Sequence, residues 1–555
     1  MKSVGSDFPM SKSFREGNDI PPFAVLLFTR RLNRLAPPAL CQFPAGTPED
    51  FMATMAIDPR LSTPTTAFLT HTHRMLIDGK FVAAASGKTF PVFNPATGEV
   101  MTRVPEAEAA DVDRAVHAAR RAFDEGPWSR MSSSERGRML WKLADLLEAN
   151  LEEFAEIESL DNGKPLTVAR AADVPLAIDM FRYMAGWCTK ITGSTLPISA
   201  GGEYLSYTLR QPVGVVAQII PWNFPLLMAA WKLGPALATG CTVVLKPAEQ
   251  TPLSALRLAE LIEEAGFPPG VVNVLTGYGE GAGAPLAAHD LVDKVAFTGS
   301  TEVGKLIVHA ATGNLKKVSL ELGGKSPAII FPDAKMEEAI AGAASAIFFN
   351  QGQCCCAGSR LFAHESVFDQ VLEGVSNIAG KIKIGPGLAP DTELGPLVSD
   401  EQFSRVSGFI ESGRSDGATV AAGGKVIGSA SPGKGGYFVQ PTVLTHTRPE
   451  MKVVREEIFG PVVVAESFSD KDIDRIAKEA NDTIYGLAAS VWTQNLSTAH
   501  KMARRIRSGT VWVNCHNVFD ASLPFGGFKQ SGWGREMGAE VLNNYLEVKA
   551  VTVKL

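Results

Sequence analysis

Residues 213–246 read VGVVAQIIPWNFPLLMAAWKLGPALATGCTVVLK, and this stretch decides the fold class. Residues 213–220 form an almost continuous apolar run, as expected for a strand buried on both faces. Residues 224–239 carry apolar side chains at helical spacing, and residues 241–246 are a second buried strand. Strand, helix and strand in this order predict a parallel βαβ unit.

The alternation continues on both sides of this stretch. A helix is predicted at 252–265, where Gly266 ends it, and strands are predicted at 271–275 and 294–298. A short strand pair at 75–81 and helices at 109–123 and 132–154 come before it, and the C-terminal half alternates less cleanly at 327–331, 336–350 and 366–384. The whole pattern predicts an α/β fold with a doubly wound sheet.

Composition narrows the class of protein. The chain has 555 residues, 45% hydrophobic and 20% charged, which is long enough for two or more globular domains. A net charge of -6 does not favour nucleic acid or an anionic membrane surface as a partner. No apolar run approaches the roughly 20 residues that span a bilayer. A small-molecule ligand is therefore expected.

The seven cysteines are irregularly spaced and odd in number, which favours a reducing compartment, taken here as the cytoplasm. No C-x-x-C pair occurs and no histidine lies near the cysteine triplet in sequence, so no metal site is expected. His71 and His73 are predicted to be surface residues. The cysteines are Cys41, Cys188, Cys241, Cys354, Cys355, Cys356 and Cys515.

Residues 1–74 differ from the rest of the chain, since they mix Pro, Ser, Thr and Arg without sustained periodicity. We expect a mostly disordered N-terminal extension. Arginines at 15, 30, 31 and 34 favour a targeting peptide instead, but acidic residues at 7, 16 and 19 argue against one. A start of translation at Met52 or Met55 is a third interpretation.

Two segments alternate with a period of two, at 204–209 and 545–554. A terminal strand with one apolar face needs a partner, either within the chain or in a neighbouring subunit.

The run FNQGQCCCAGSR at 349–360 suggests covalent catalysis by sulfur, because a thiolate is a good nucleophile. Consecutive side chains point in different directions, so one cysteine can face a pocket while the others pack away. Packing is the preferred role for Cys354 and Cys356, with tunnel lining or oxidative trapping of Cys355 as alternatives.

Polar residues follow several strand ends, where open parallel sheets bind ligands. Glu321 stands among apolar residues before Gly-Gly and is a candidate general base, although a Glu paired with Lys or Arg is the plainer interpretation. Asn223 is a candidate oxyanion donor or an ordinary helix cap. Lys246 and Glu249 suit the hydroxyls of a ribose, and the turn at 299–300 suits a pyrophosphate. The glycine-rich loop at 277–283 does not fit G-x-G-x-x-G and is weak evidence alone.

Seven motifs together resemble the NAD(P)-dependent aldehyde dehydrogenase superfamily, in order and spacing. They are PWNFP at 221–225, KPAEQTP at 246–252, FTGSTEVG at 297–304, LELGGKSP at 320–327, FFNQGQCCCAGSR at 348–360, EEIFGPV at 456–462 and PFGGFKQSGWGRE at 524–536. The resemblance runs from about residue 75 to 555, and the branch that it indicates is the tetrameric one that oxidises acetaldehyde, retinal and phenylacetaldehyde.

The resemblance implies a role for each matching position. Cys355 is the nucleophile, Glu321 the general base, and Asn223 the oxyanion donor together with the Cys355 backbone N–H. Glu249 favours NAD over NADP, because its carboxylate would repel a 2′-phosphate. The implied cofactor-binding residues are Ile219, Pro221, Trp222, Lys246, Glu249, Gly279, Gly283, Phe297, Gly299, Ser300, Val303, Leu322, Gln402, Glu457 and Phe459.

It also implies an architecture. A Rossmann-type NAD-binding domain at 75–190 and 213–322, a catalytic α/β domain at 323–535, and a small β oligomerisation arm at 191–212 and 540–555 are expected, in a homotetramer. The implied substrate-binding residues are Phe224, Leu227, Met228, Trp231, Phe349, Cys354, Cys356, Phe519 and Phe525.

Four residues, Phe224, Leu227, Met228 and Trp231, fall on one helix face. Periodicity alone favours a core stripe, whereas the resemblance places this face along the substrate tunnel. Because no Arg or Lys stands among the tunnel positions, we expect an apolar aromatic or medium-chain aldehyde, with phenylacetaldehyde as first choice. The loop with His516 and Asn517 bears on selectivity without indicating a substrate.

The resemblance implies that the aldehyde is oxidised to its carboxylic acid through a thiohemiacetal and then a thioester on Cys355. Glu321 favours hydrolysis of this thioester over its transfer to coenzyme A, because the branch that acylates coenzyme A lacks this glutamate. The alternatives are a broad-specificity acetaldehyde or retinal type of enzyme, and a catalytically silent structural relative, against which the intact set Cys355, Glu321 and Asn223 argues.

Overall fold

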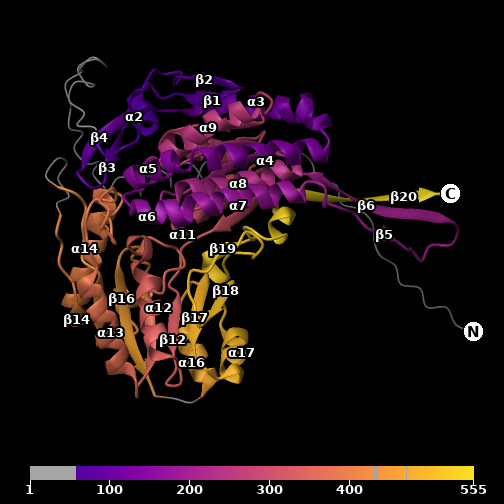
Figure 1. Cartoon of the computed structure of the whole chain (residues 1–555). Coiled ribbons are helices and arrows are strands. Elements are labelled where there is room, and N and C mark those ends of the chain that lie inside the picture. The colour runs from indigo at the N-terminus through magenta and orange to yellow at the C-terminus, as the bar shows by residue number, and fades with distance from the viewer. Residues whose placement is uncertain (1–57, 429–434, 470–471) are drawn as a thin grey trace, which may run out of the picture. The chain divides into compact units, whose positions relative to one another are not determined.

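The computed structural model describes residues 58–428, 435–469 and 472–555. In these ranges the chain builds two large sheets and two small ones, with helices between the strands (Figure 1). No helix of the described ranges combines the length and the apolar character needed to cross a bilayer. Residues 1–57 lie outside the description, and with them the targeting-peptide and late-start interpretations of the extension.

The first large sheet has eight strands, and its five middle strands run parallel. The predicted βαβ unit is confirmed, because β7 and β8 pair in parallel through helix α8 (Pro225–Thr239). The strand order is β19 (Gly532–Trp533), β11 (Lys317–Glu321), β10 (Lys294–Thr298), β7 (Val215–Ile219), β8 (Thr242–Lys246), β9 (Val272–Val274), β1 (Met75–Ile77) and β2 (Lys80–Val82).

The strand order also locates a ligand crevice. From β7 the chain builds outward through β8 and β9, and then returns to the other side of β7 with β10 and β11. Open α/β sheets bind ligands beyond the carboxyl ends of the strands where the order reverses in this way. The loops after β7, β10 and β11 therefore meet at one crevice.

The second large sheet has seven strands, of which β14 alone pairs antiparallel to its neighbour. Its central strands β12 and β13 are joined by helix α12 and the cysteine run. The order is β14 (Thr419–Ala422), β15 (Thr442–Thr445), β16 (Val462–Phe468), β13 (Arg360–His364), β12 (Pro327–Ile330), β17 (Ala488–Trp492) and β18 (Thr510–Val513). The α/β fold class predicted from the alternation is confirmed in both sheets.

The two strands with a period of two pair with each other within the chain. β20 (Leu546–Lys554) runs antiparallel to β6 (Tyr204–Pro212), with Leu209 opposite Lys549, and β5 (Thr195–Leu196) adds a third strand. Figure 1 shows β6 and β20 side by side, away from the helices. A separate hairpin is formed by β3 (Thr89–Asn94) and β4 (Glu99–Pro105).

The remaining helices connect these strands or cover the sheets. In the first half they are α2 (Thr63–Thr70), α3 (Ala109–Asp124), α4 (Ser133–Ala149), α5 (Leu151–Asn162), α6 (Leu166–Val168), α7 (Val174–Trp187), α9 (Leu253–Ala265), α10 (Ala284–Ala288) and α11 (Thr301–Ala311). In the second half they are α12 (Met336–Phe348), α13 (Phe368–Lys381), α14 (Asp400–Ser415), α15 (Lys452–Arg455), α16 (Ile473–Ala480) and α17 (Leu496–Arg505).

Two expectations for the N-terminal part need correction. The expected disorder does not extend over residues 58–74, because α2 forms there and Ser62 Oγ donates to the carboxylate of Glu156 at 2.7 Å. His73 is not a surface residue. It is 4% exposed and packs against Phe68, with ring centroids 4.9 Å apart, because α2 buries the apolar face of the segment. Burial lowers the pKa of His73 to about 3.

Candidate active site

A cavity of about 730 Å³ lies where the loops after β7, β10 and β11 meet the cysteine run. This volume is typical of a small-molecule site. The predicted site residues that line it are Pro221, Trp222, Asn223, Phe224, Leu227, Met228, Trp231, Gly299, Ser300, Glu321, Leu322, Phe349, Cys354, Cys355, Cys356, Gln402, Glu457, Phe459, Phe519 and Phe525. The structure thus brings together residues that span more than 300 positions of the chain.

The other predicted cofactor residues do not line this cavity. They lie at the ends of β7, β8 and β10, in the loops after β8 and β9, or in α11, and are Ile219, Lys246, Glu249, Gly279, Gly283, Phe297 and Val303. The Nζ of Lys246 lies 3.7 Å from the Glu249 carboxylate, and a Cβ on Gly283 would lie 3.6 Å from the Lys246 side chain. Ser300 caps α11 by accepting a hydrogen bond from Val303 N at 3.2 Å. These residues form a polar and glycine-rich edge beside the cavity loops.

Cys355 is the most accessible member of the cysteine run. It is half-buried, whereas Cys354 and Cys356 are 5% and 1% exposed and their sulfurs lie 3.3 Å apart. Hydrogen bonding to the other two sulfurs lowers the pKa of Cys354, whereas hydrogen bonding with Cys354 and burial raise the pKa values of Cys355 and Cys356. The three thiols therefore titrate as one coupled group. All three cysteines line the cavity, and Cys355 is the most exposed of them.

Asn223 is not a helix cap. The first residue before α8 is Phe224, and the N–H of Leu226 in the first turn donates to the Glu158 carboxylate at 3.1 Å. Instead the Asn223 side-chain Nδ2 donates to the backbone oxygen of Gln353 at 3.1 Å, two residues before Cys355. One of the two amide hydrogens is thereby bound to the cysteine loop, and the other remains for a cavity ligand.

Glu321 is 3% exposed, and neither of its carboxylate oxygens has a hydrogen-bond partner in the described part of the chain. The plainer interpretation, a Glu paired with Lys or Arg, is therefore wrong. Burial raises the pKa of Glu321 well above its usual range, the charge of Glu536 adds to this, and Lys232 opposes it. A carboxyl group that is unpaired and has a raised pKa is suited to accept a proton near neutral pH.

A buried ion pair lies close to Glu321. Lys232 Nζ is 2.6 Å from Glu536 Oε1, with the two side chains 0% and 6% exposed. The backbone oxygen of Lys232 accepts from Gln218 Nε2 at 2.8 Å, which fixes this part of α8 against β7. Lys232 therefore forms its ion pair with Glu536 and not with Glu321.

The Gly-Gly after Glu321 allows the close approach that the sequence predicted. A Cβ on Gly323 would lie 2.1 Å from Glu457 Oε2, and a Cβ on Gly324 would lie 2.3 Å from the backbone oxygen of Cys355. Gly324 N donates to Glu457 Oε1 at 2.8 Å. Burial raises the pKa of Glu457 to about 7. The turn therefore joins the base strand, Glu457 and the nucleophile loop.

The residues around the cavity fit the dinucleotide that the resemblance implies. Thr298 Oγ1 is buried at the end of β10 without a partner in the described ranges, and Lys246 Nζ is bonded only within its own loop, to Pro247 O at 2.9 Å. A Cβ on Gly299 would lie 2.5 Å from the Phe297 ring, so glycine is the residue that fits at this turn. Trp222 and Phe459 pack edge to face, 5.1 Å apart, and Phe459 holds a φ of 61°.

Aromatic rings form the other end of the cavity. Trp231 lies 5.5 Å from Phe525 and 6.3 Å from Phe519, and Phe224 stacks on Phe349 at 6.2 Å. The helix face that carries Trp231 is buried and also lines the cavity. The core-stripe interpretation and the tunnel interpretation of this face therefore each hold in part. Rings at this spacing suit a flat apolar ligand.

His516 and Asn517 line the same cavity from the loop after β18. His516 Nε2 lies 3.0 Å from the Cys356 backbone oxygen, so this nitrogen carries the proton. Asn517 Oδ1 accepts from the Cys356 thiol at 3.4 Å. Burial lowers the pKa of His516 to about 4, and the ring is therefore neutral at neutral pH.

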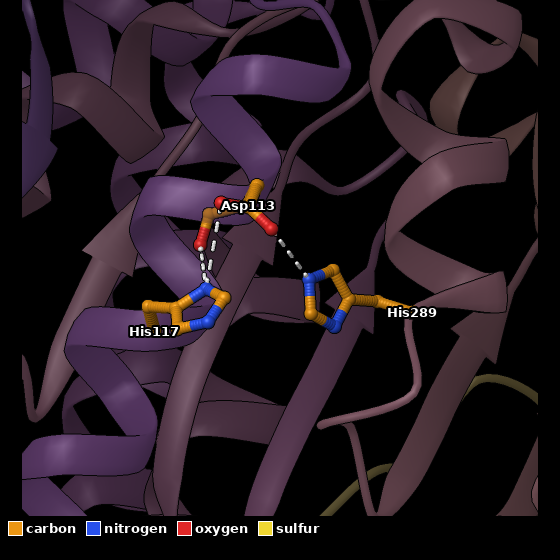
Figure 2. Close-up of side chains that lie close together, drawn as sticks. All are labelled: Asp113, His117 and His289. Carbon is orange, nitrogen blue, oxygen red and sulfur yellow. Dashed lines mark hydrogen bonds and ion pairs between the residues drawn. The ribbon is translucent and has the colours of Figure 1, made fainter.

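A second cluster of potential ligands consists of Asp113, His117 and His289, whose ligand atoms lie within 4.8 Å of one another (Figure 2). His289 Nδ1 accepts the backbone N–H of Leu291 at 3.1 Å, so its proton is on Nε2, facing Asp113. A metal ligand needs that nitrogen free and the other one protonated. The cluster is thus arranged as a hydrogen-bonded surface group.

Several residues of the site were missed from the sequence. Asp173, Leu176, Arg405 and Tyr485 line the cavity from segments without a strand-end motif. Three further buried residues do not line the cavity and lie behind the residues that do: Lys164, Lys232 and Asn350. A lysine inside the apolar stretch 225–239 was a signal for Lys232, since a buried lysine needs a partner.

Comparison with known proteins agrees with this geometry. The family model described as "Aldehyde dehydrogenase family" matches residues 81–551. Aldehyde dehydrogenase family 2 member B4, mitochondrial, of Arabidopsis thaliana is 53% identical over 88% of this chain and 89% of its own length. Benzaldehyde dehydrogenase, mitochondrial, of Antirrhinum majus is 50% identical over 87% of this chain and 89% of its own length.

A solved structure is also similar along the chain. The NAD+ complex of an aldehyde dehydrogenase from Bacillus cereus has a TM-score of 0.87 and 52% identity, and covers 89% of this chain and 99% of its own. At this identity the similarity extends beyond the fold to the family.

Proposed function

The chain belongs to the aldehyde dehydrogenase family and oxidises aldehydes with NAD, and we propose that its substrate is an apolar aromatic or medium-chain aldehyde, phenylacetaldehyde first. The product is the carboxylic acid. The observation that carries this proposal is the cavity in which accessible Cys355, unpaired Glu321 and the Asn223 amide meet under aromatic walls. The roles of these residues are part of the proposal.

In the proposed mechanism the Cys355 sulfur attacks the aldehyde carbon. The carbonyl oxygen gains negative charge, and the free N–H of the Asn223 amide and the backbone N–H of Cys355 donate to it. Such a donor contributes about 3 kcal/mol in comparable sites. When bound, NAD+ accepts the hydride that leaves the tetrahedral carbon. The residues that would hold it are the edge at Lys246 and Glu249, the Gly299–Ser300 turn, and Glu457 with Phe459.

Loss of the hydride leaves a thioester on Cys355. Glu321 takes a proton from a water molecule, and the resulting hydroxide attacks the thioester carbon. The C–S bond breaks, the acid leaves, and the proton on Glu321 can return to the sulfur or pass to solvent. The absence of a hydrogen-bond partner for Glu321 in the described ranges supports this role, since its lone pairs are free.

Aromatic side chains support an aryl substrate. Trp231, Phe519 and Phe525 lie within 6.3 Å of one another by ring centroids. Across the cavity, Phe224 and Phe349 add a stacked pair. The relative from Antirrhinum majus is named a benzaldehyde dehydrogenase, which agrees with an aryl aldehyde. Acetaldehyde and retinal remain the alternative substrates.

We also propose a homotetramer in the cytoplasm, with residues 191–212 and 540–555 as the assembly arm. Leu205, Leu209, Val548 and Val553 are apolar and exposed on the β5–β6–β20 sheet, and a second subunit would cover them. The proposed domains at 75–190 with 213–322 and at 323–535 each contain most strands of one large sheet, although β19 of the first sheet comes from the second range. Six free cysteines in the described ranges fit a reducing compartment.

The test is the rate of NADH formation from phenylacetaldehyde, acetaldehyde, an amino aldehyde and a dicarboxylic semialdehyde, with NAD and with NADP. The highest kcat/KM is expected for phenylacetaldehyde with NAD. C355A should abolish NADH formation, while C354A and C356A should retain it. A far higher kcat/KM for the semialdehyde would refute the substrate class, and activity of C355A would refute the nucleophile.

A further inference from the structure

Asn350 belongs to the loop of the cysteine run and contacts the loop after β7, so it joins the two loops that carry the proposed oxyanion donors. It is the second residue after α12, is 3% exposed, and has a backbone φ of 49°. Its Nδ2 donates to the Asn223 backbone oxygen at 3.0 Å and to the Gln353 backbone oxygen at 3.1 Å. Both amide hydrogens are thereby used, one on each loop.

These bonds close a ring with the Asn223 side chain. Asn223 Nδ2 donates to the same Gln353 oxygen at 3.1 Å. The backbone oxygen of Asn223 is therefore held by Asn350, and its side-chain amide is held by the carbonyl that Asn350 also binds. Because the backbone oxygen and the side-chain amide of Asn223 are both held by hydrogen bonds, its side-chain torsion angles are fixed. The remaining amide hydrogen can therefore point in one direction only.

Lys164 completes the support from behind. Its Nζ donates to the Asn223 backbone oxygen at 3.2 Å, lies 4.3 Å from the Phe224 ring centroid, and is paired with Asp173. The lysine side chain is 0% exposed. Asn223 thus accepts from two buried donors, of which Asn350 alone also contacts the nucleophile loop.

We propose that Asn350 is a positioning residue, which sets the Asn223 amide relative to Cys355 so that the amide stabilises the oxyanion. The inference rests on the proposed role of Asn223. An oxyanion donor acts only when it is preorganised at the position where charge develops. A left-handed backbone at Asn350 is a conformation that asparagine adopts more readily than most residues, and it presents the side chain to both carbonyl groups.

The test compares two Asn350 variants with a matched control. N350D keeps the shape but places one carboxylate oxygen, in the position of Nδ2, against two carbonyl oxygens, and N350G keeps the left-handed backbone without the side chain. Asn273 is the control, since its buried Nδ2 also donates to two backbone oxygens, of Val243 at 3.2 Å and Gly270 at 2.9 Å, away from the cavity. Thermal midpoints show whether each variant is folded.

We expect kcat with phenylacetaldehyde to fall about 10²-fold in N350D and about tenfold or more in N350G, with KM values changed less than about threefold. N273D should lose stability comparably but keep kcat. The decisive measurement is the N223A/N350G double variant. Because Asn350 acts through Asn223, N350G should lower kcat less than about twofold in the N223A background.

Different results separate the two proposals. If N223A keeps wild-type kcat, the oxyanion role of Asn223 fails, and this inference fails with it. If N223A loses activity but N350D and N350G lose no more than N273D, the positioning role alone is refuted. Multiplicative losses in the double variant would also refute it, because Asn350 would then act independently of Asn223.

Discussion

Replacing Glu321 by Gln separates the two halves of the reaction. The side chains have the same shape, and neither carboxylate oxygen has a hydrogen-bond partner in the ranges that the structure describes, so no bond is lost. What is lost is a base. General-base catalysis contributes about 10²- to 10⁴-fold, and E321Q should lower kcat by that factor, equivalent to roughly 3–5 kcal/mol of barrier.

The assay is stopped-flow absorbance of NADH with phenylacetaldehyde and NAD. Attack by Cys355 and hydride loss precede hydrolysis, so E321Q should release about one NADH per subunit in a burst and then turn over slowly. E401Q is the matched control, because Glu401 also lines the cavity but is exposed, and it should behave as wild type.

The pH dependence gives a second check on the same group. Burial raises the pKa of Glu321, so its basic form is present above that raised pKa and is lost as pH falls through it. Wild-type kcat should therefore rise with pH, and the rise should vanish in E321Q. Absence of a burst together with an unchanged steady rate would refute the assignment of Glu321 as the hydrolytic base.

Three further changes test other parts of the structure. H73F should make stability less sensitive to acid. The pKa of His73 is lowered from 6.5 to about 3 in the folded protein, so the unfolded chain binds the proton better. Between pH 7 and pH 5 the free energy of unfolding should therefore fall by about 2 kcal/mol more in wild type than in H73F, as followed by thermal midpoints. An equal loss in both proteins would contradict this. E249Q should raise kcat/KM with NADP relative to NAD by about tenfold, because it removes the carboxylate, 3.7 Å from Lys246 Nζ, that would repel the 2′-phosphate of NADP. An unchanged ratio would exclude Glu249 from cofactor choice. W231A should lower kcat/KM for phenylacetaldehyde by about 5- to 30-fold and for acetaldehyde much less, because one wall of the aromatic end is lost; equal losses would place Trp231 in packing alone.

The sequence predicted the strands of the first sheet well, for a physical reason. A strand buried on both faces is apolar throughout, and glycine marks the end of the helix that follows, as Gly240 and Gly266 do with φ values of 96° and 90°. The predicted helix at 132–154 is in fact two helices, α4 and α5. The break is at Asn150, whose side chain donates to the Leu146 oxygen at 2.8 Å. Periodicity alone does not reveal such a side-chain competitor.

The candidate site residues that belong to local motifs could be predicted from the sequence. Those that depend on contacts with residues distant in the sequence could not. Cys355, Glu321 and Asn223 each belong to a local motif. By contrast, Asn350 was part of a quoted motif, but its role depends on two carbonyl oxygens, one of them 127 positions away. His73 was missed because burial by α2 depends on Phe68 and not on the polarity of the histidine itself.

The arrangement of acids in the cavity also constrains the order of events. Cys355 and Glu321 face one low-dielectric cavity. Hydrogen bonding to Cys354 and burial raise the pKa of the neighbouring Cys356 thiol, and the charge of Glu321 adds to this. Two anions at once would be costly there. In the proposed mechanism, attack on the aldehyde consumes the thiolate and the thioester that follows is neutral. Glu321 can then ionise and take a proton from water without a second negative charge beside it. A thiol cluster and a raised carboxyl pKa in one cavity are therefore compatible because each is ionised in a different half of the reaction.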